Sequence, residues 1–266
     1  MQIQMPRLFP DDRPVLGGSR IVSLVVQARD PAAARAFYAE ALGLPLVADD
    51  GRSVRLDAGT LVLDLRRAAP GEPPRAGRTR VVLAAADPGA LARDLAARGV
   101  RVGPDGAFTD PDGNRLALSA PAADAPGEGV GPHGVSVAEV VLDVGDAKAA
   151  ASLFQGGLDL RPAGEQNGRV RYDAGALALT TVHADGAAAD AQGGIAPVFH
   201  VEDLGDTVWQ LARRGIPLAR TVTYSRNGGV ARLRAPSGHL LWLWEPSDEA
   251  RDGPGGRRLE QLLARA

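Results

Sequence analysis

The second half of the chain carries three short segments in which the chemically useful side chains occupy only one of the two alternating sets of positions. Glu139 and Asp143 alternate with apolar residues in EVVLD, His200 ends the segment APVFH, and Trp242 and Trp244 alternate in LLWLW. Because strand side chains alternate between faces, each segment presents these groups on one side of a sheet. Two carboxylates, an imidazole and two indoles on one surface could bind a planar ligand or move a proton.

Glu139 and His200 are the candidate catalytic pair. A carboxyl group enclosed by apolar side chains could act as a general base or acid and pass protons to an imidazole. Arg169 and Arg171 lie on a neighbouring predicted strand. They favour the simpler interpretation, in which Glu139 forms a structural ion pair.

Composition excludes several other classes of chemistry and partner. The 30 basic and 32 acidic residues leave a net charge of −2, so neither nucleic acid nor an anionic membrane is an expected partner. The absence of cysteine excludes disulfides and thiolate metal sites. Neither a signal peptide nor the roughly 18 apolar residues of a membrane helix can be found, so we expect a cytoplasmic protein.

The chain contains an internal repeat. SLVVQARDPAAARAFYAEALGL, from Ser23, aligns with EVVLDVGDAKAAASLFQGGLDL, from Glu139, at a shift of 116 residues. Two copies of one folding unit are therefore predicted. The shift grows to 125 between Gly113 and Gly238, which places nine extra residues around TVTYSRNGG. These residues predict a longer loop or strand pair at the rim of the second unit.

Each unit divides into two modules that open with a strand and a helix. Asp30 is a suitable N-cap before Pro31, and Gly99 suits the end of a helix over 88–98. Two or three short strands follow each helix. The pattern predicts four βαβββ-like modules, at about 20–68, 78–119, 135–183 and 194–246.

We expect these modules to be arranged in two units with additional segments. The predicted order is an N-terminal extension over 1–18, a first unit over 19–120, a linker over 121–134, a second unit over 135–247 and a C-terminal tail helix over 248–266. Leu259, Leu262 and Leu263 recur at helical spacing in that tail, which could pack on its own chain or on a partner. A monomer or a homodimer is expected.

Four motifs occur along the chain: a strand ending in V-x-x-D, a helix ending in FY before L-G-L, a D-P-D-G-N turn and a final apolar strand. Together they resemble the vicinal oxygen chelate superfamily, which contains glyoxalases, bleomycin-resistance proteins and extradiol dioxygenases. The resemblance covers roughly 20–120 and 135–246. It implies an α+β fold in which four βαβββ modules pair into two cupped mixed sheets, with helices on the outer face and a ligand cavity on the concave face.

The resemblance also implies where a metal ion would be held. Superfamily members with metal chemistry place His or Glu at particular cup-facing strand positions. The corresponding residues here are Ser23, Asp64, Arg80, Ala117, Glu139, Thr180, Ala196 and Trp242. A divalent ion needs about three His or carboxylate ligands, whereas each unit offers one carboxylate. Combining modules across the units also gives one, so we predict neither a metal ion nor another cofactor.

The cup of the second unit is the expected functional site. Besides the catalytic pair, the candidate ligand-binding residues are Asp143, Thr180, Trp242, Trp244, Asp64 and Arg80. Asp64 and Arg80 could hold a charged substrate group, although an internal salt bridge would explain both. The two tryptophans could likewise bind an aromatic ligand or only fill a closed core.

Three functions remain open at this point. The first is a metal-free protein that binds or sequesters a small aromatic or natural-product ligand, similar to the bleomycin-resistance branch. The second is a metal-independent isomerase, lyase or cyclase that uses Glu139 with His200 or Asp143. The third is a dioxygenase or glyoxalase with unusual metal ligands. The sequence does not decide whether the protein is an enzyme.

Overall fold

The computed structural model describes residues 14–68, 78–122, 129–184, 194–252 and 261, and their strands fall into four modules. The first module contains β1 (Ile21–Ala28), β2 (Leu46–Asp49), β3 (Ser53–Asp57) and β4 (Val62–Arg67). The second contains β5 (Thr79–Ala84), β6 (Ala107–Thr109) and β7 (Arg115–Ser119). The third contains β8 (Ser136–Val144), β9 (Pro162–Gln166), β10 (Arg169–Asp173) and β11 (Ala178–His183). The fourth contains β12 (Ile195–His200), β13 (Leu218–Ser225), β14 (Gly228–Arg234) and β15 (Leu240–Glu245).

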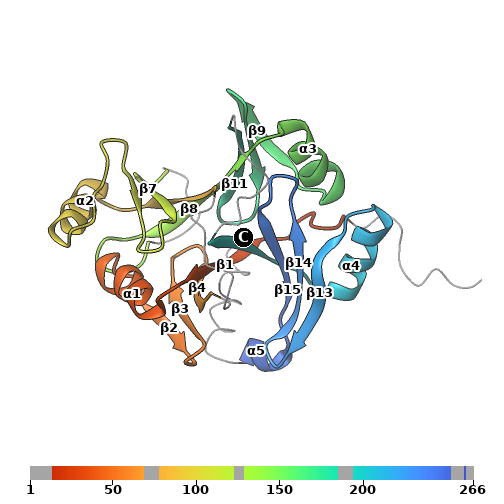
Figure 1. The fold of residues 1–266 in the computed structure, drawn as a ribbon, viewed down its shortest axis with the longest axis horizontal. Helices are drawn as coiled ribbons and strands as arrows, with labels where there is room; N and C mark the ends of the chain where they lie inside the picture. The colour runs from red at the N-terminus through yellow and green to blue at the C-terminus, as the bar shows by residue number, and fades with distance from the viewer. Residues whose placement is uncertain (1–13, 69–77, 123–128, 185–193, 253–260, 262–266) are drawn as a thin grey trace, which may run out of the picture.

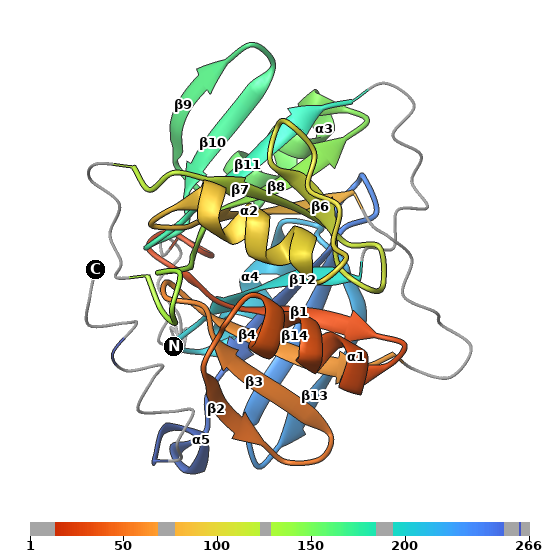
Figure 2. The same ribbon diagram turned by 90° about the vertical axis from the view of Figure 1, so that its left-hand side faces the viewer.

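The modules pair across the two repeat units. The first sheet has eight strands in the order β13-β14-β15-β12-β1-β4-β3-β2, and the second has seven in the order β6-β7-β5-β8-β11-β10-β9. The first sheet thus joins modules one and four, and the second joins modules two and three (Figures 1 and 2). Each sheet is mixed and cupped, as predicted. Each concave face therefore takes residues from both repeat units.

Helices cover the outer faces of both sheets (Figure 1). They are α1 (Pro31–Arg35), α2 (Pro88–Ala97), α3 (Ala147–Ala151) and α4 (Leu204–Arg213), whereas the short α5 (Asp248–Asp252) lies at the concave side of the first sheet, where its Ala250 lines a pocket. The first four begin after the aspartates Asp30, Asp87, Asp146 and Asp203, whose side chains accept backbone N–H groups of the first turn. This N-capping stabilises each helix start, as predicted for Asp30.

The helices preserve the internal repeat. α1 and α3 each continue into a six-residue π-helical turn, Ala36–Ala41 and Ser152–Gly157, and the two turns are 116 residues apart. The nine additional residues of the second unit lie in the hairpin of β13 and β14, where the first unit has only the three-residue β6. The predicted strand pair at the rim is confirmed.

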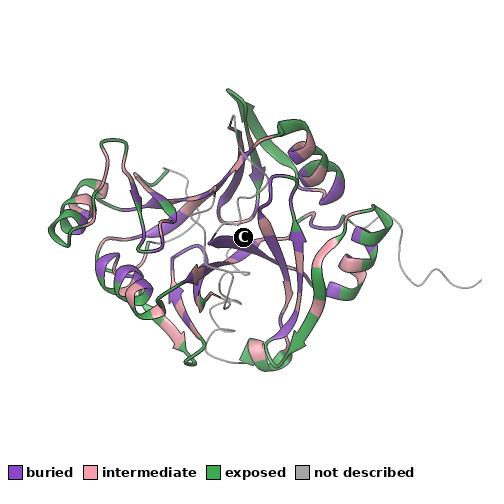
Figure 3. Cartoon of the chain, viewed as in Figure 1, coloured by how far each residue is buried: buried purple, intermediate pink, exposed green. Residues whose placement is uncertain are grey.

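Two apolar clusters lie on opposite faces of the first sheet. Leu24, Val26, Leu63 and Leu243 belong to the large buried core beneath the helices. The alternate residues Val25, Ala196, Val198 and Trp242 form a smaller buried cluster on the concave face. Figure 3 shows buried strands and exposed outer helix surfaces. The alternation confirms which strand residues face the cup.

A buried polar turn connects the two sheets within the first repeat unit. Asp110 accepts hydrogen bonds from the Tyr38 hydroxyl at 2.9 Å and from the Asn114 side-chain amide at 2.7 Å. Asp112 of the same turn accepts from the Arg29 side chain at 2.9 Å. Burial raises the pKa of Asp110 above 3.8 and that of Tyr38 well above 10.0. Tyr38 therefore stays protonated and donates to the carboxylate.

Some predicted segments lie wholly or partly outside the described residues. These are the N-terminal extension, the middle of the 121–134 linker and nearly all of the predicted tail helix. α5 is the described beginning of that tail. Among the described residues, no helix combines the length and apolarity needed to cross a membrane.

Replacing Tyr38 by Phe should destabilise the protein by about 1–3 kcal/mol, because Asp110 loses a buried donor. Tyr172→Phe is the matched control, since Tyr172 is also fully buried but its hydroxyl meets only Gln155 at 3.5 Å. Urea denaturation should show the larger loss for Tyr38→Phe. Equal losses in the two variants would contradict a structural role for the Tyr38–Asp110 bond.

The buried His239 should make stability depend on pH. Its Nδ1 lies 2.8 Å from Ser237 Oγ, and burial lowers the pKa of His239 below 6.5 despite the nearby Asp143. The unfolded chain therefore takes up a proton that the folded chain resists, and the free energy of unfolding should decrease as the pH falls below 6.5.

His239 occupies the position that corresponds to Asn114 in the first unit, so asparagine is a suitable replacement. His239→Asn should weaken this pH dependence. Denaturation at about pH 7.5 and about pH 5.5 would measure the effect. His183→Asn is the control, because His183 is exposed and should leave the dependence unchanged. The explanation would be wrong if His239→Asn lost as much stability on acidification as the wild type.

Candidate functional site

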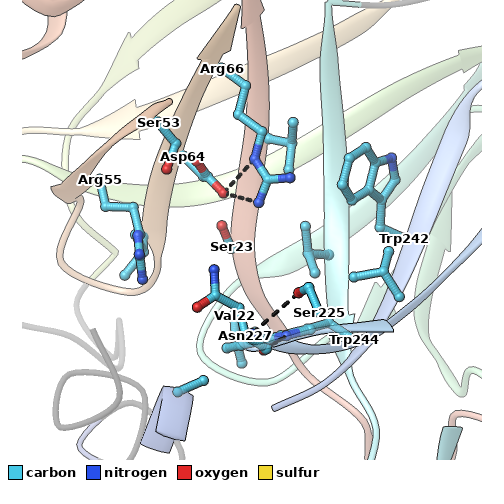
Figure 4. A pocket seen from close by; sticks show the side chains of 15 residues that line it. Val22, Ser23, Ser53, Arg55, Asp64, Arg66, Ser225, Asn227, Trp242 and Trp244 are labelled. Atoms are coloured by element: carbon cyan, nitrogen blue, oxygen red, sulfur yellow. Dashed lines mark hydrogen bonds and ion pairs between the residues drawn. The ribbon is translucent and has the colours of Figure 1, made fainter. Parts of the chain in front are cut away.

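A cavity of about 170 Å³ opens on the concave face of the first sheet (Figure 4). Its apolar wall consists of Val22, Val25, Val62, Val198, Val230, Trp242, Trp244 and Ala250. Its polar groups are Ser23, Ser53, Arg55, Asp64, Arg66, Ser225 and Asn227. An apolar pocket with a few converging polar groups is the usual form of a small-molecule site.

Strand register explains why distant residues meet in this cavity. Ser23 on β1 pairs with Val198 on β12, and Val198 pairs with Trp242 on β15. On the other side of β1, Val25 pairs with Asp64 on β4. The first-unit positions 23 and 64 therefore share a cup with the second-unit positions 196 and 242.

Asp64 is the buried acidic group of the cavity. Its side chain is 9% exposed, and its Oδ2 accepts hydrogen bonds from Arg66 Nε at 2.8 Å and Arg66 Nη2 at 2.5 Å. Its other oxygen, Oδ1, is buried and has no hydrogen-bond partner among the described residues. A buried acceptor without a donor costs free energy, and a bound donor group would remove that cost.

Trp242 lies between the apolar floor and two arginines. The guanidinium of Arg232 lies 4.2 Å from the centre of the indole ring, and that of Arg66 lies 5.3 Å away. Burial, with the nearby Arg220 and Arg66, lowers the pKa of the Arg232 guanidinium from its usual value. Cation–π contacts thus hold two guanidinium groups at the cavity wall.

Trp244 connects the cavity wall to the hairpin of β13 and β14. Its Nε1 donates to the Asn227 carbonyl at 2.9 Å. The Ser247 hydroxyl donates to the Arg226 carbonyl in the same turn, and the Ala250 N–H donates to Ser247 Oγ at 3.1 Å. These bonds fix the hairpin tip beside α5 at one side of the cavity.

The polar groups of the second sheet are largely paired with one another. Glu139 Oε1 accepts a short hydrogen bond from Thr180 and lies 3.3 Å from Arg169 Nη2. Asp143 forms an ion pair with Arg115 at 2.5 Å. Arg169 reaches Glu139 in the manner expected of a structural ion pair.

The cross-unit pairing separates residues that were expected to act together. Glu139, Asp143, Thr180 and Arg80 lie on the second sheet, whereas Asp64, His200, Trp242 and Trp244 lie on the first. Glu139 therefore has no access to His200 as a proton partner within one cup, and Asp64 pairs with Arg66 instead of Arg80. His200 lies at the end of β12 outside the cavity lining, and burial lowers its pKa below 6.5.

Three of the predicted residues do line the cavity, namely Asp64, Trp242 and Trp244. Sequence reasoning missed Ser53, Arg55, Ser225 and Asn227 as lining residues, because they come from hairpins at the two edges of the sheet. The extra residues around TVTYSRNGG were the available signal for the second of these hairpins.

Comparisons with known proteins agree with this architecture. Residues 20–118 match the model of the Glyoxalase/Bleomycin resistance protein/Dioxygenase superfamily. No functionally curated protein matches the sequence. The structure is similar to that of glyoxalase I from Zea mays, with a TM-score of 0.68 and 15% identity over 92% of this chain and 95% of that one. It is also similar to a putative dioxygenase from Bacillus subtilis, with a TM-score of 0.65 and 19% identity over 91% of this chain and 90% of that one.

The residues at the expected metal-binding positions do not fit a divalent ion. The first cup presents Ser23, Asp64, Ala196 and Trp242, with one carboxylate already bound to Arg66. Within the described parts of the chain, no three His, Asp or Glu side chains are grouped as a metal site requires. At one of the expected metal-binding positions, Trp242 places an indole ring, and the guanidiniums of Arg66 and Arg232 lie over it.

Purified protein should therefore contain much less than one divalent ion per chain. Elemental analysis after dialysis, followed by calorimetric titration with zinc and manganese, would measure this content. Asp64→Asn should leave the result unchanged, because a single carboxylate does not form a site. One tightly held ion per chain that is lost in Asp64→Asn would overturn the assignment of these positions.

Proposed function

We propose that the protein binds a small planar organic molecule in the first-sheet cavity. It does so without a metal ion held by its own side chains. The premise is that residues 20–118 match the glyoxalase/bleomycin resistance protein/dioxygenase superfamily. The described chain has the corresponding fold in two tandem units. One observation carries this proposal. The buried, unpartnered Asp64 Oδ1 and the two tryptophans of β15 converge on one apolar cavity.

The cavity size supports a compact ligand. Its 170 Å³ suits a single ring, since a cavity of roughly 150 Å³ can bind benzene. The valines on β1, β4, β12 and β14 supply apolar contact, while Trp244 and the Arg66 guanidinium supply flat surfaces. A hydroxyl or N–H group on the ring would donate to Asp64 Oδ1.

Sequestration is favoured over catalysis by the placement of the acid–base candidates. The proposed isomerase, lyase or cyclase needed Glu139 together with His200 or Asp143. His200 lies on the other sheet, and both carboxylates are already paired with arginines. Capture of an aromatic or natural-product molecule needs only the cavity. One chain supplies both modules of the cup, so a monomer suffices for binding.

Tryptophan fluorescence provides a direct test. Trp209 lies exposed on α4, so a Trp209→Phe background leaves Trp242 and Trp244 as the reporters. We expect planar compounds that carry a hydrogen-bond donor to quench this emission in a saturable manner. A broad panel of such compounds with no saturable response would count against the proposal.

A matched pair of variants then locates the site. Val198 and Val82 occupy equivalent positions in the two units, and Val198 lines the first-sheet cavity while Val82 faces a hollow on the second sheet. Val198→Phe should weaken binding at least about tenfold by filling the cavity, at a stability cost of about 1–3 kcal/mol. Val82→Phe should retain wild-type affinity. Loss of binding in Val82→Phe alone would move the site to the second sheet.

A further inference from the structure

We infer that the mouth of the first-sheet cavity is a binding subsite for an acidic group, and that the natural ligand is a ring carrying a carboxylate or phosphate. The inference rests on the proposed function, because the ring must enter the cavity while its acidic group stays at the mouth. Arg52 and Arg226 are the residues that would hold this group.

Two hairpins from opposite edges of the first sheet meet at this mouth. The turn between β2 and β3 contains Arg52, and the turn between β13 and β14 contains Arg226. Both turns line one hollow of about 690 Å³, formed by Asp50, Arg52, Ser53, Arg66, Ser225, Arg226 and Asn227. Four of these residues also line the inner cavity, so the two spaces adjoin.

The charges around the hollow are unbalanced. It contains three arginines and one aspartate, Asp50. The Asp50 carboxylate already accepts the N–H groups of Arg52 and Ser53, both at 2.9 Å, and lies 3.8 Å from Arg55. These backbone hydrogen bonds, and more weakly Arg55 and Arg226, lower the pKa of Asp50 below 3.8. Among the described residues, no acidic side chain forms an ion pair with Arg52 or Arg226.

The backbone at both tips is held in place. Asp50 fixes the turn before Arg52, and Ser247 and Trp244 fix the carbonyls of Arg226 and Asn227. The curled sheet therefore brings two guanidiniums to one opening, and neither forms an ion pair with an acidic side chain of the described residues. An anion at this opening would accept from both, because arginine donates in pairs to carboxylate and phosphate oxygens.

Two probes with a similar ring separate the acidic group from the ring. 4-Nitrophenyl phosphate carries the anion, and 4-nitrobenzyl alcohol is neutral. In the Trp209→Phe background we expect the phosphate to bind about tenfold more tightly. The double variant Arg52→Gln/Arg226→Gln should remove that advantage and leave the alcohol unchanged. Arg93→Gln/Arg98→Gln is the charge-matched control on the exposed side and end of α2 and should bind both probes as before.

Failure of the subsite and failure of the cavity give different results. If both probes bind equally and the double variant changes neither, the acidic subsite is wrong and the cavity proposal stands. If the phosphate probe depends on Arg52 and Arg226 but not on Val198→Phe, the subsite stands and the ring does not enter the cavity. 4-Nitrobenzoate in a third arm distinguishes a carboxylate from a phosphate preference.

Inorganic phosphate tests the subsite without any ring. At matched ionic strength, phosphate should raise the melting temperature of the wild type more than that of the double variant. Equal shifts in the two proteins, together with equal affinity for the charged and neutral probes, would overturn the inference.

Discussion

The antiparallel pairing of β1 with β12 is the constraint on which the candidate site depends. It joins the first module to the last, and through it Asp64 on β4 and Trp242 on β15 reach the same concave face. Side chains alternate along each strand, so a slip of one residue would exchange Val25 and Val198 for core residues such as Leu24 and Phe199. The buried core therefore enforces the register that forms the cavity.

The two cups share an architecture but differ in how their polar groups are satisfied. On the second sheet, Glu139 is bonded to Thr180 and Arg169, and Asp143 to Arg115. The first sheet retains buried polar atoms without partners at Asp64 Oδ1 and Trp242 Nε1. Thr79 Oγ1 and Arg80 Nε are similar exceptions on the second sheet, but neither residue lines the hollow described there. A donor group of the proposed ligand would supply a partner for the Asp64 oxygen.

Much of the fold follows from local sequence rules, whereas the contents of each cup do not. Aspartate caps, the repeat shift and strand alternation predicted the helix starts, the edge hairpin and the shared face of Trp242 and Trp244. The same rules could not place Glu139 relative to His200, because the first strand of each module could pair with a module of the same unit or of the other unit. Long-range pairing between β1 and β12 and between β5 and β8 decides this, and the alternation of residues along a strand does not reveal it. The Arg66–Trp242 contact was missed for the same reason, because Arg66 lies in the first unit and Trp242 in the second.

The replacement of ligand residues need not leave the first cup electrically neutral. In a metal-holding cup the ion is the largest local positive charge and attracts electron-rich groups of the ligand. Here an indole occupies one such position, and cation–π contacts bring the Arg66 and Arg232 guanidiniums to it. Asp64 neutralises only Arg66, and Arg232 is held in a partly desolvated position where its charge is weakly screened. Positive charge is thus supplied by side chains with fixed shape, which suits the anionic or electron-rich ring of the proposed function.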